Sequence, residues 1–170
     1  MHRIGDKVYY PYFGIGTVQD IIVGDFQGHE QEYYVIDISP EEMKVMIPIE
    51  RAESVGLRRV ISSRDVPKVL RILEERNHLC SKDKDYYKWY ANCLEKIESS
   101  NILEVAEAVA DFLGKRDRKN LSLRERELLK RGLYLLSTEI AWAKKIKKSR
   151  AKRLILESWK KMHSSRSPKY

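Results

Sequence analysis

Four aromatic residues stand within five positions in the stretch DYYKWYANCLEKI, residues 85–97. They are Tyr86, Tyr87, Trp89 and Tyr90, and Lys88 lies among them. Because the 170 residues contain only 3 Trp, 10 Tyr and 3 Phe, this is a local concentration of rings. Such rings either fill a hydrophobic core or contact a partner outside the protein, where a flat ring can stack on a nucleic-acid base.

The spacing of this stretch is typical of a helix with one apolar face. At about 100° per residue, one face holds Tyr86, Tyr90, Cys93, Leu94 and Ile97. We therefore expect Tyr90 to belong to the core. Tyr86 stands at the start of the helix, where a side chain can project beyond the domain.

No stretch of the sequence assembles the chemistry of an enzyme. GIG at residues 14–16 lies between expected strands, so it is not a dinucleotide fingerprint, and a phosphate-cradling loop motif is absent. The histidines lack metal-ligand spacing, and two cysteines are too few for a structural zinc site. The paired carboxylates at 41–42 and 74–75 are adjacent, so their side chains point apart. We expect no enzymatic activity, no cofactor, no metal and no small-molecule substrate.

Composition favours a cytoplasmic protein. No apolar run approaches the about 20 residues needed to cross a bilayer, so we expect no membrane partner. The first residues, MHRIGDKVYY, lack the apolar stretch of a signal peptide. Cys80 and Cys93 form no disulfide framework, and we expect both thiols to be reduced.

Charge divides the chain into two halves. Residues 1–60 carry 6 Lys and Arg against 10 Asp and Glu, a net charge of −4, whereas residues 61–170 carry 27 against 15, a net charge of +12. Such asymmetry suggests two modules with different partners. The basic half favours a polyanion, and nucleic acid is the partner that we expect.

Residues 1–62 have the pattern of short β-strands. Runs rich in Val, Ile and Tyr occupy residues 7–10, 14–23, 31–39 and 43–49, with Gly- and Pro-containing turns between them. Four or five strands in so short a segment predict a small closed β-barrel. A barrel of this size leaves little room for a catalytic cleft, and its loops and outer strands suit docking.

Residues 63–170 have a helical pattern. Asn101 with Glu104, and Ser122 with Glu125, have the spacing of N-terminal capping pairs. Beyond the aromatic stretch, helices are expected over residues 65–76, 101–116, 122–146 and, behind Ser149, up to 163, before a frayed basic tail. The sequence therefore predicts an α+β protein with two domains: a β-barrel, and an all-α domain of about five helices.

Three stretches carry a resemblance to a known family. They are GDKVYYPYFGIGTV; EYYVIDI followed by MKVMIPIERAESVGLRRV; and YYKWYANCLEKI followed by SSNILEVAEAVADF and LSLRERELLKRGLYLL. In this order and spacing the chain resembles the CarD family of bacterial transcription regulators over roughly residues 2–145. The first two stretches are also similar to the polymerase-interacting domain of the transcription-repair coupling factor.

The resemblance implies a mechanism. A Tudor-like barrel docks on the β subunit of RNA polymerase, and the helical domain touches promoter DNA at the upstream edge of the transcription bubble. An aromatic wedge, tryptophan in most members, enters the minor groove and helps to keep the strands apart. We therefore expect a monomeric, nucleoid-associated regulator that stabilises the open promoter complex.

The family motif also implies particular residues. It places the wedge at Tyr86, and Trp89 stands where a basic residue is usual, so either ring can serve as the wedge. On the barrel, Gly24, Phe26 and Met46 occupy the positions that family members use for polymerase. They are small or apolar here, where some relatives carry arginine.

Basic residues near the wedge are candidates for phosphate contacts. They are Lys82, Lys84, Lys88, Arg124, Arg126, Lys130 and Arg131. A denser cluster, from Lys144 to Arg153, extends past the best-matched region. It is either an auxiliary DNA contact or a solubilising face.

Two other classes of function compete with this interpretation. A general RNA-binding or ribosome-associated protein with a Tudor-like barrel would carry stacked aromatics and basic residues on its strands, and the acidic first half argues against it. A regulatory subunit that binds only protein is disfavoured by the net charge of +12 over residues 61–170.

Overall fold

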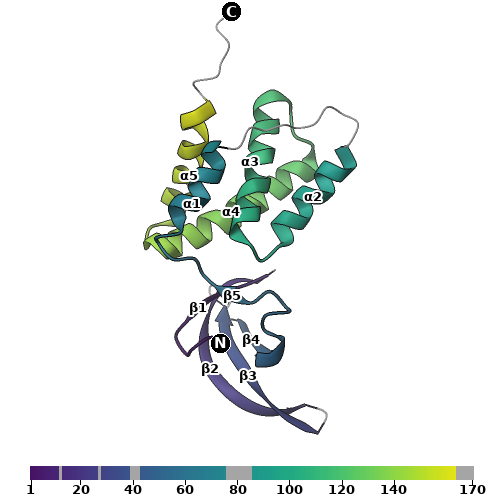
Figure 1. Cartoon of the computed structure of the whole chain (residues 1–170), viewed down its shortest axis with the longest axis vertical. Helices are drawn as coiled ribbons and strands as arrows, with labels where there is room; N and C mark the ends of the chain where they lie inside the picture. Colours follow the sequence, from purple (N-terminus) through teal and green to yellow (C-terminus); the bar gives the residue numbers. More distant parts are fainter. Residues whose placement is uncertain (12, 27, 39–42, 76–85, 164–170) are drawn as a thin grey trace, which may run out of the picture. The chain divides into compact units, whose positions relative to one another are not determined.

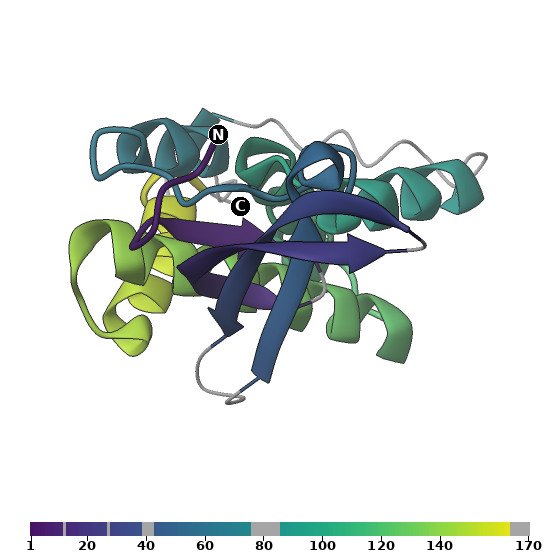
Figure 2. The ribbon, with the colours of Figure 1, turned by 90° about the horizontal axis from the view of Figure 1, so that it is seen from below.

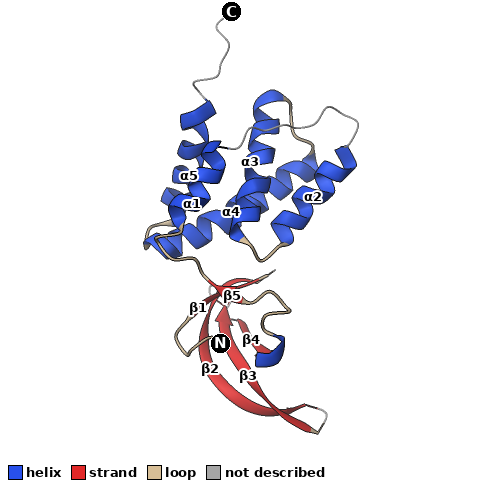
Figure 3. Cartoon of the chain, viewed as in Figure 1, coloured by secondary structure: helices blue, strands red, loops and turns tan. Residues whose placement is uncertain are grey.

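Strands and α-helices occupy separate parts of the chain, as Figure 3 shows. The computed structural model describes residues 1–11, 13–26, 28–38, 43–75 and 86–163. It divides into two units, Met1–Val60 and Ile61–Tyr170. A sheet unit followed by a helical unit confirms the predicted two-domain α+β class.

The first unit is an antiparallel sheet. Its strands are β1 (Lys7–Tyr10), β2 (Gly14–Phe26), β3 (His29–Ile38), β4 (Met43–Pro48) and β5 (Arg58–Arg59). They lie in the order β4-β3-β2-β1-β5, so β4 and β5 are the edge strands of the ladder over the described residues. A short 3-10 helix, η1 (Ile49–Arg51), follows β4.

Alternation of buried and partly buried side chains along β3 defines the core face of this sheet. Tyr34, Ile36 and Ile38 are buried, whereas the residues between them are only partly buried. The register of β2 against β3 shifts between Val18 and Asp20. Such a bulge bends a strand, and β2 and β3 curve along their length in the two views of Figures 1 and 2.

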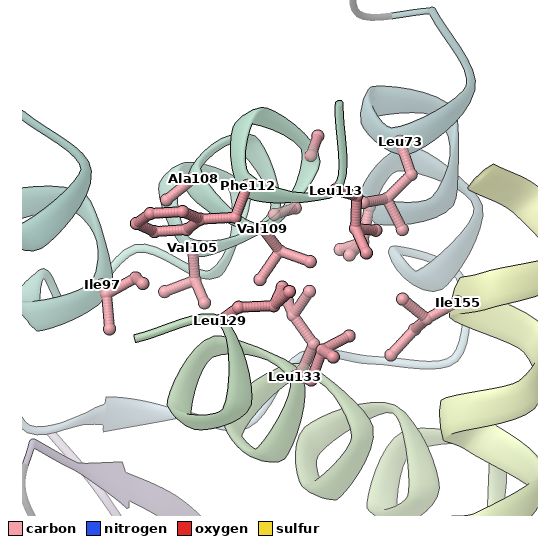
Figure 4. Close-up of a cluster of buried hydrophobic side chains, with 14 of the residues drawn as sticks. Leu73, Ile97, Val105, Ala108, Val109, Phe112, Leu113, Leu129, Leu133 and Ile155 are labelled. Atoms are coloured by element: carbon pink, nitrogen blue, oxygen red, sulfur yellow. The ribbon is translucent and has the colours of Figure 1, made fainter. Parts of the chain in front are cut away.

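The second unit holds the five helices of the described residues. They are α1 (Val66–Glu75), α2 (Tyr86–Glu98), α3 (Ile102–Arg118), α4 (Leu123–Lys144) and α5 (Lys148–His163). Helix α3 packs between α2 and α4, and α1 packs against both α3 and α5. Figure 4 shows apolar side chains from all five helices, among them Leu73, Ile97, Phe112, Leu133 and Ile155, filling the centre of this unit.

Side-chain caps begin two of these helices. Ser122 and Glu125 form the reciprocal capping box that their spacing predicts. Asn101 caps α3 by accepting from the backbone N–H of Leu103, but Glu104 binds the Asn101 side chain instead of its backbone. The prediction that the last helix begins behind Ser149 is wrong. Helix α5 begins at Lys148, before Ser149 and not behind it, because the carbonyl of residue 147 already accepts the N–H groups of residues 150 and 151.

Candidate nucleic-acid interface and docking face

Helix α2 presents its aromatic residues at the edge of the helical core. Cys93 and Ile97 are buried, and Tyr90 and Leu94 are partly buried against the same core. This arrangement confirms the expected apolar face. Tyr86, at the first position of the helix, remains 38% exposed.

The two wedge candidates have different surroundings. Trp89 packs against the core, edge-to-face with Phe112 at a centroid distance of 5.3 Å. Tyr86 lies outside it, with its ring centroid 6.0 Å from that of Trp89 and 6.1 Å from that of Tyr90. Trp89 and Tyr90 therefore support the ring of Tyr86 from behind.

Tyr87 is an exposed ring that the sequence analysis did not select. Its side chain is 87% exposed, and its ring meets that of Tyr86 edge-on at 5.7 Å. The exposure of Tyr87 could have been predicted from the helix pattern, because a ring that lies off the apolar face of α2 cannot enter the core. Two neighbouring tyrosines therefore stand exposed at the start of α2.

Lys115, near the end of α3, joins the starts of α2 and α4. Its ammonium lies 4.7 Å from the ring centroid of Tyr86 and 4.8 Å from that of Trp89, which are cation–π contacts. The same ammonium forms an ion pair with the buried carboxylate of Glu125. The other oxygen of Glu125 accepts the backbone N–H of Ser122 at 2.7 Å. A single lysine thus connects the wedge candidates to the cap of α4.

The pKa of the Glu125 carboxyl reflects these contacts. Burial alone raises the pKa, but hydrogen bonds from Lys115 and Ser122 to the ionised form outweigh burial and hold the pKa below its usual value. The sequence predicts Glu125 only as a capping residue. Its pairing with Lys115 joins positions ten residues apart, which the capping motif does not specify.

The predicted phosphate contacts have different environments. Lys88, Arg124, Arg126 and Lys130 are exposed. Arg131 lies 3.6 Å from Glu98, so it also joins α4 to α2. Two further candidates, Lys82 and Lys84, lie outside the described residues.

Three helix ends meet around Lys115, and we call this region the basic–aromatic end. It comprises the start of α2, the end of α3 and the start of α4. Its members are Tyr86, Tyr87, Lys88, Trp89, Lys115, Arg116, Arg118, Lys119, Arg124 and Arg126. The charge run KRDRK at the end of α3 was not among the predicted contacts, although its density was visible in the sequence. Clustered cations beside exposed rings can neutralise phosphates and stack on bases.

Two of the three predicted docking residues lie on one face of the sheet. Met46 pairs with Val35 in β3, and Gly24 pairs with Gln31, four residues before Val35. Because side chains alternate along a strand, these positions share the face opposite the core. Phe26 pairs with His29 near the hairpin end, and its side chain lies outside the described part of the structure.

This outer face is apolar along its centre. Met46 is 52% exposed, and its partner Val35 in β3 is partly exposed. Ile22, also partly exposed, pairs with Tyr33, two positions before Val35 in β3. The ring of Tyr33 lies across Gly24, because a Cβ built on that glycine would stand 3.1 Å from the ring. We call Ile22, Tyr33, Val35 and Met46 the outer apolar strip. An exposed apolar row of this kind is typical of a protein-binding surface.

None of the helices over the described residues is long and apolar enough to span a membrane. The sheet unit carries the outer apolar strip, and the helical unit carries the basic–aromatic end. Comparison with known proteins identifies the kind of protein. The family model of the CarD-like/TRCF RID domain matches residues 2–61, and that of the CarD C-terminal domain matches residues 68–156. The chain belongs to the CarD-like transcription factor family.

The chain is also similar to individual proteins. YdeB of Bacillus subtilis, provisionally named a transcription factor, is 29% identical over 154 residues, which cover 89% of this chain and 98% of YdeB. The N-terminal domain of Myxococcus xanthus CarD, solved by NMR, is 26% identical, with a TM-score of 0.30, over 34% of this chain and 76% of the domain. The CdnLNt structure from the same organism is 42% identical, with a TM-score of 0.32, over 36% of this chain and 87% of that structure's chain. Membership of a transcription factor family is consistent with the expected non-enzymatic function.

Proposed function

We propose that this chain binds the β subunit of RNA polymerase through residues 1–62 and promoter DNA through residues 63–170, and thereby stabilises the open promoter complex. The observation that carries the proposal is the basic–aromatic end. Exposed rings stand there at the start of α2, with cations from three helices around them.

The first step of this function is docking on polymerase. The outer apolar strip supports it, because an exposed apolar row on a sheet can bury its area against a partner. The adjacent edge strand β4 also offers backbone groups for strand pairing. The net charge of −4 over residues 1–60 makes this unit a poor match for a nucleic acid. For that reason we do not favour the RNA-binding alternative.

The second step is insertion of a ring at the bubble edge. We assign the wedge to Tyr86, because it is exposed while Trp89 and Tyr90 back its ring. A ring that stacks on a base contributes about 1–3 kcal/mol, which offsets the unstacking of a base step. Trp89 then acts as the support that fixes the direction of Tyr86.

Phosphate contacts hold the duplex beside this ring. Lys88, Arg124 and Arg126 are exposed at the same end. Contacts to phosphate and a minor-groove wedge carry little sequence information. We therefore expect the protein to stabilise open complexes with little preference for base sequence, while polymerase and its sigma factor choose the promoter.

The test is the lifetime of open complexes after addition of a competitor. Tyr86→Ala removes a ring and no charge, so docking and phosphate contacts should survive. Loss of a stacking contribution of about 1–3 kcal/mol should speed collapse about five- to a hundredfold. Tyr87→Ala is the matched control, because it removes an equally large and more exposed neighbouring ring. The assignment fails if Tyr87→Ala speeds collapse and Tyr86→Ala does not, and the wedge mechanism fails if neither does.

A further inference from the structure

The junction of α4 and α5 concentrates positive charge away from the basic–aromatic end. Seven of the ten residues from 144 to 153 are Lys or Arg, and none is Asp or Glu. All seven are exposed except Lys148, which is partly buried. Arg153 faces Glu157 at 3.9 Å, and both of these side chains are more than half exposed. Exposed ion pairs of this kind contribute little free energy. We call residues 142–153 the α4–α5 corner.

Aromatic side chains accompany these charges. The ammonium of Lys148 lies over the ring of Tyr134, 2.9 Å from its centroid. Tyr134 is 49% exposed, and Trp142, in the last turn of α4, is 46% exposed. Trp142 also lines a hollow of 320 Å³ with Ala141, Lys145 and Ile146. The corner therefore combines flat half-exposed rings with a dense set of cations.

The cations of the corner repel one another. Burial lowers the pKa of Lys148, and the charge of Lys152, one helical turn further on, lowers it again. Residues four apart on a helix are neighbours, and like charges at that spacing are destabilising. A bound polyanion would relieve this repulsion.

Helix α4 sets the distance between the corner and the basic–aromatic end. It spans 22 residues, Leu123–Lys144, which at about 1.5 Å per residue is a length of about 33 Å. One turn of duplex DNA rises by about 34 Å. A duplex that runs along α4 would therefore present equivalent groove edges to both ends of the helix.

The surface of α4 between these ends is compatible with such a path. Arg126, Lys130 and Tyr134 recur every four residues, so they follow one face, and all three are exposed. Glu127 is the acidic residue exposed beside them. Single-stranded nucleic acid lacks a fixed repeat of this length, so the spacing favours duplex.

We propose that the α4–α5 corner is a second contact for the phosphates of duplex DNA, one helical turn from the basic–aromatic end. The proposal rests on the proposed function only in the choice of DNA as the polyanion. Such a contact would hold the duplex along α4 at two points and fix its direction across the helical unit.

The test measures binding of the full-length chain to a fluorescent duplex of about three helical turns over a range of salt concentrations. The corner variant is Lys147→Gln, Arg150→Gln and Lys152→Gln, three exposed side chains whose loss leaves the core intact. Each phosphate contact contributes a slope of about 0.9 in log K against log salt. We expect the corner variant to lower the slope by about 2 to 3 and to weaken binding at least about tenfold.

The matched control removes three exposed charges from the first unit, through Arg3→Gln, Lys44→Gln and Arg51→Gln. It should leave the slope unchanged. A corner variant that binds like the parent protein, or a control that weakens binding equally, overturns the proposal. So does an effect that appears only with a single-stranded RNA of the same length.

A further variant separates this proposal from the proposed function. Arg124→Gln with Arg126→Gln removes cations from the basic–aromatic end only. If this variant lowers the slope and the corner variant does not, the second contact is refuted and the first is retained. If the corner variant alone lowers it, the second contact is supported and the phosphate contacts assigned to the basic–aromatic end are refuted.

Discussion

The ammonium of Lys115 lies 4.7 Å from the ring centroid of Tyr86, and the partner that fixes it there is the buried carboxylate of Glu125. The side chains of Lys115 and Glu125 are only 15% and 2% exposed. A ring of this kind could be mobile if it projected alone from a helix start. Here a charge that is itself anchored in the cap of α4 lies against it, so the wedge candidate is attached to two other helices.

The first prediction concerns this anchor. Lys115→Met keeps most of the side-chain length but leaves the carboxylate of Glu125 buried without its cation. Removing one partner of a buried pair costs about 3–5 kcal/mol, and the partial exposure of Lys115 lowers our expectation to about 2–4 kcal/mol. The loss is measured as the difference in free energy of unfolding in urea between the parent protein and Lys115→Met.

The control for this anchor keeps the charge. Lys115→Arg should lose less stability, because a guanidinium can still pair with the carboxylate. The double variant Lys115→Met with Glu125→Gln should recover part of the loss, because it removes the unpaired charge. Equal stability of Lys115→Met and the parent protein would show that the pair contributes nothing.

The second prediction is a pH dependence. The pKa of Glu125 is lower in the folded protein than its ordinary value of 4.5, so in acid the unfolded chain takes up this proton first. The stability that ionised Glu125 contributes is therefore complete above about pH 5.5 and is lost as pH falls through the lowered native pKa. The difference in unfolding free energy between the parent protein and Glu125→Gln should shrink over that window. Glu127→Gln, which removes an exposed carboxylate from the same helix, is the control. A difference for Glu125→Gln that stays constant over this window would contradict the prediction.

The third prediction tests the close approach of α3 and α4. Gly132 has no side chain, and a Cβ added there would stand 2.6 Å from a methyl group of Val109. Alanine favours an isolated helix over glycine by about 1 kcal/mol, yet overpacking a core costs about 1–3 kcal/mol. Gly132→Ala should therefore destabilise the protein in thermal or urea unfolding.

A double-mutant cycle gives the control for this contact. Val109→Ala removes the methyl group that meets the new Cβ. In the Val109→Ala background, Gly132→Ala should cost little or raise stability. Additive losses from the two substitutions would mean that the two positions do not couple.

The sequence predicted those features that depend on neighbouring residues. The strand runs, the helix periodicity and the capping box at Ser122 all arise from contacts within a few positions, so they could be read directly. The burial of Cys93 and Ile97 followed from the apolar face of α2. The family motif pointed to Tyr86 as a candidate, but the contacts of its ring with Trp89, Tyr90 and Lys115 were not predicted.

Features that join distant segments could not be predicted in this way. The cation–π contacts of Lys115 depend on the packing of α3 against α2, which no local pattern encodes. The outer apolar strip depends on the register of three strands, and a shift of one residue would turn Met46 toward the core. The early start of α5 is, by contrast, a local feature for which the sequence favoured the wrong residue: the carbonyl of residue 147 accepts two N–H groups, whereas the sequence signal had favoured Ser149.

The last prediction concerns the outer apolar strip. Met46→Asp places a carboxylate at the β4 end of the strip, on its most exposed side chain, where docking would have to strip water from the charge. We expect affinity for the isolated β subunit to fall about tenfold or more, since a strong interface contact contributes about 2 kcal/mol. The protein itself should remain folded, because Met46 is 52% exposed. Val23→Asp is the matched control, since Val23 is 65% exposed but pairs with Glu32 in the row on the opposite face. If Val23→Asp weakens binding and Met46→Asp does not, polymerase docks on the other face of the sheet.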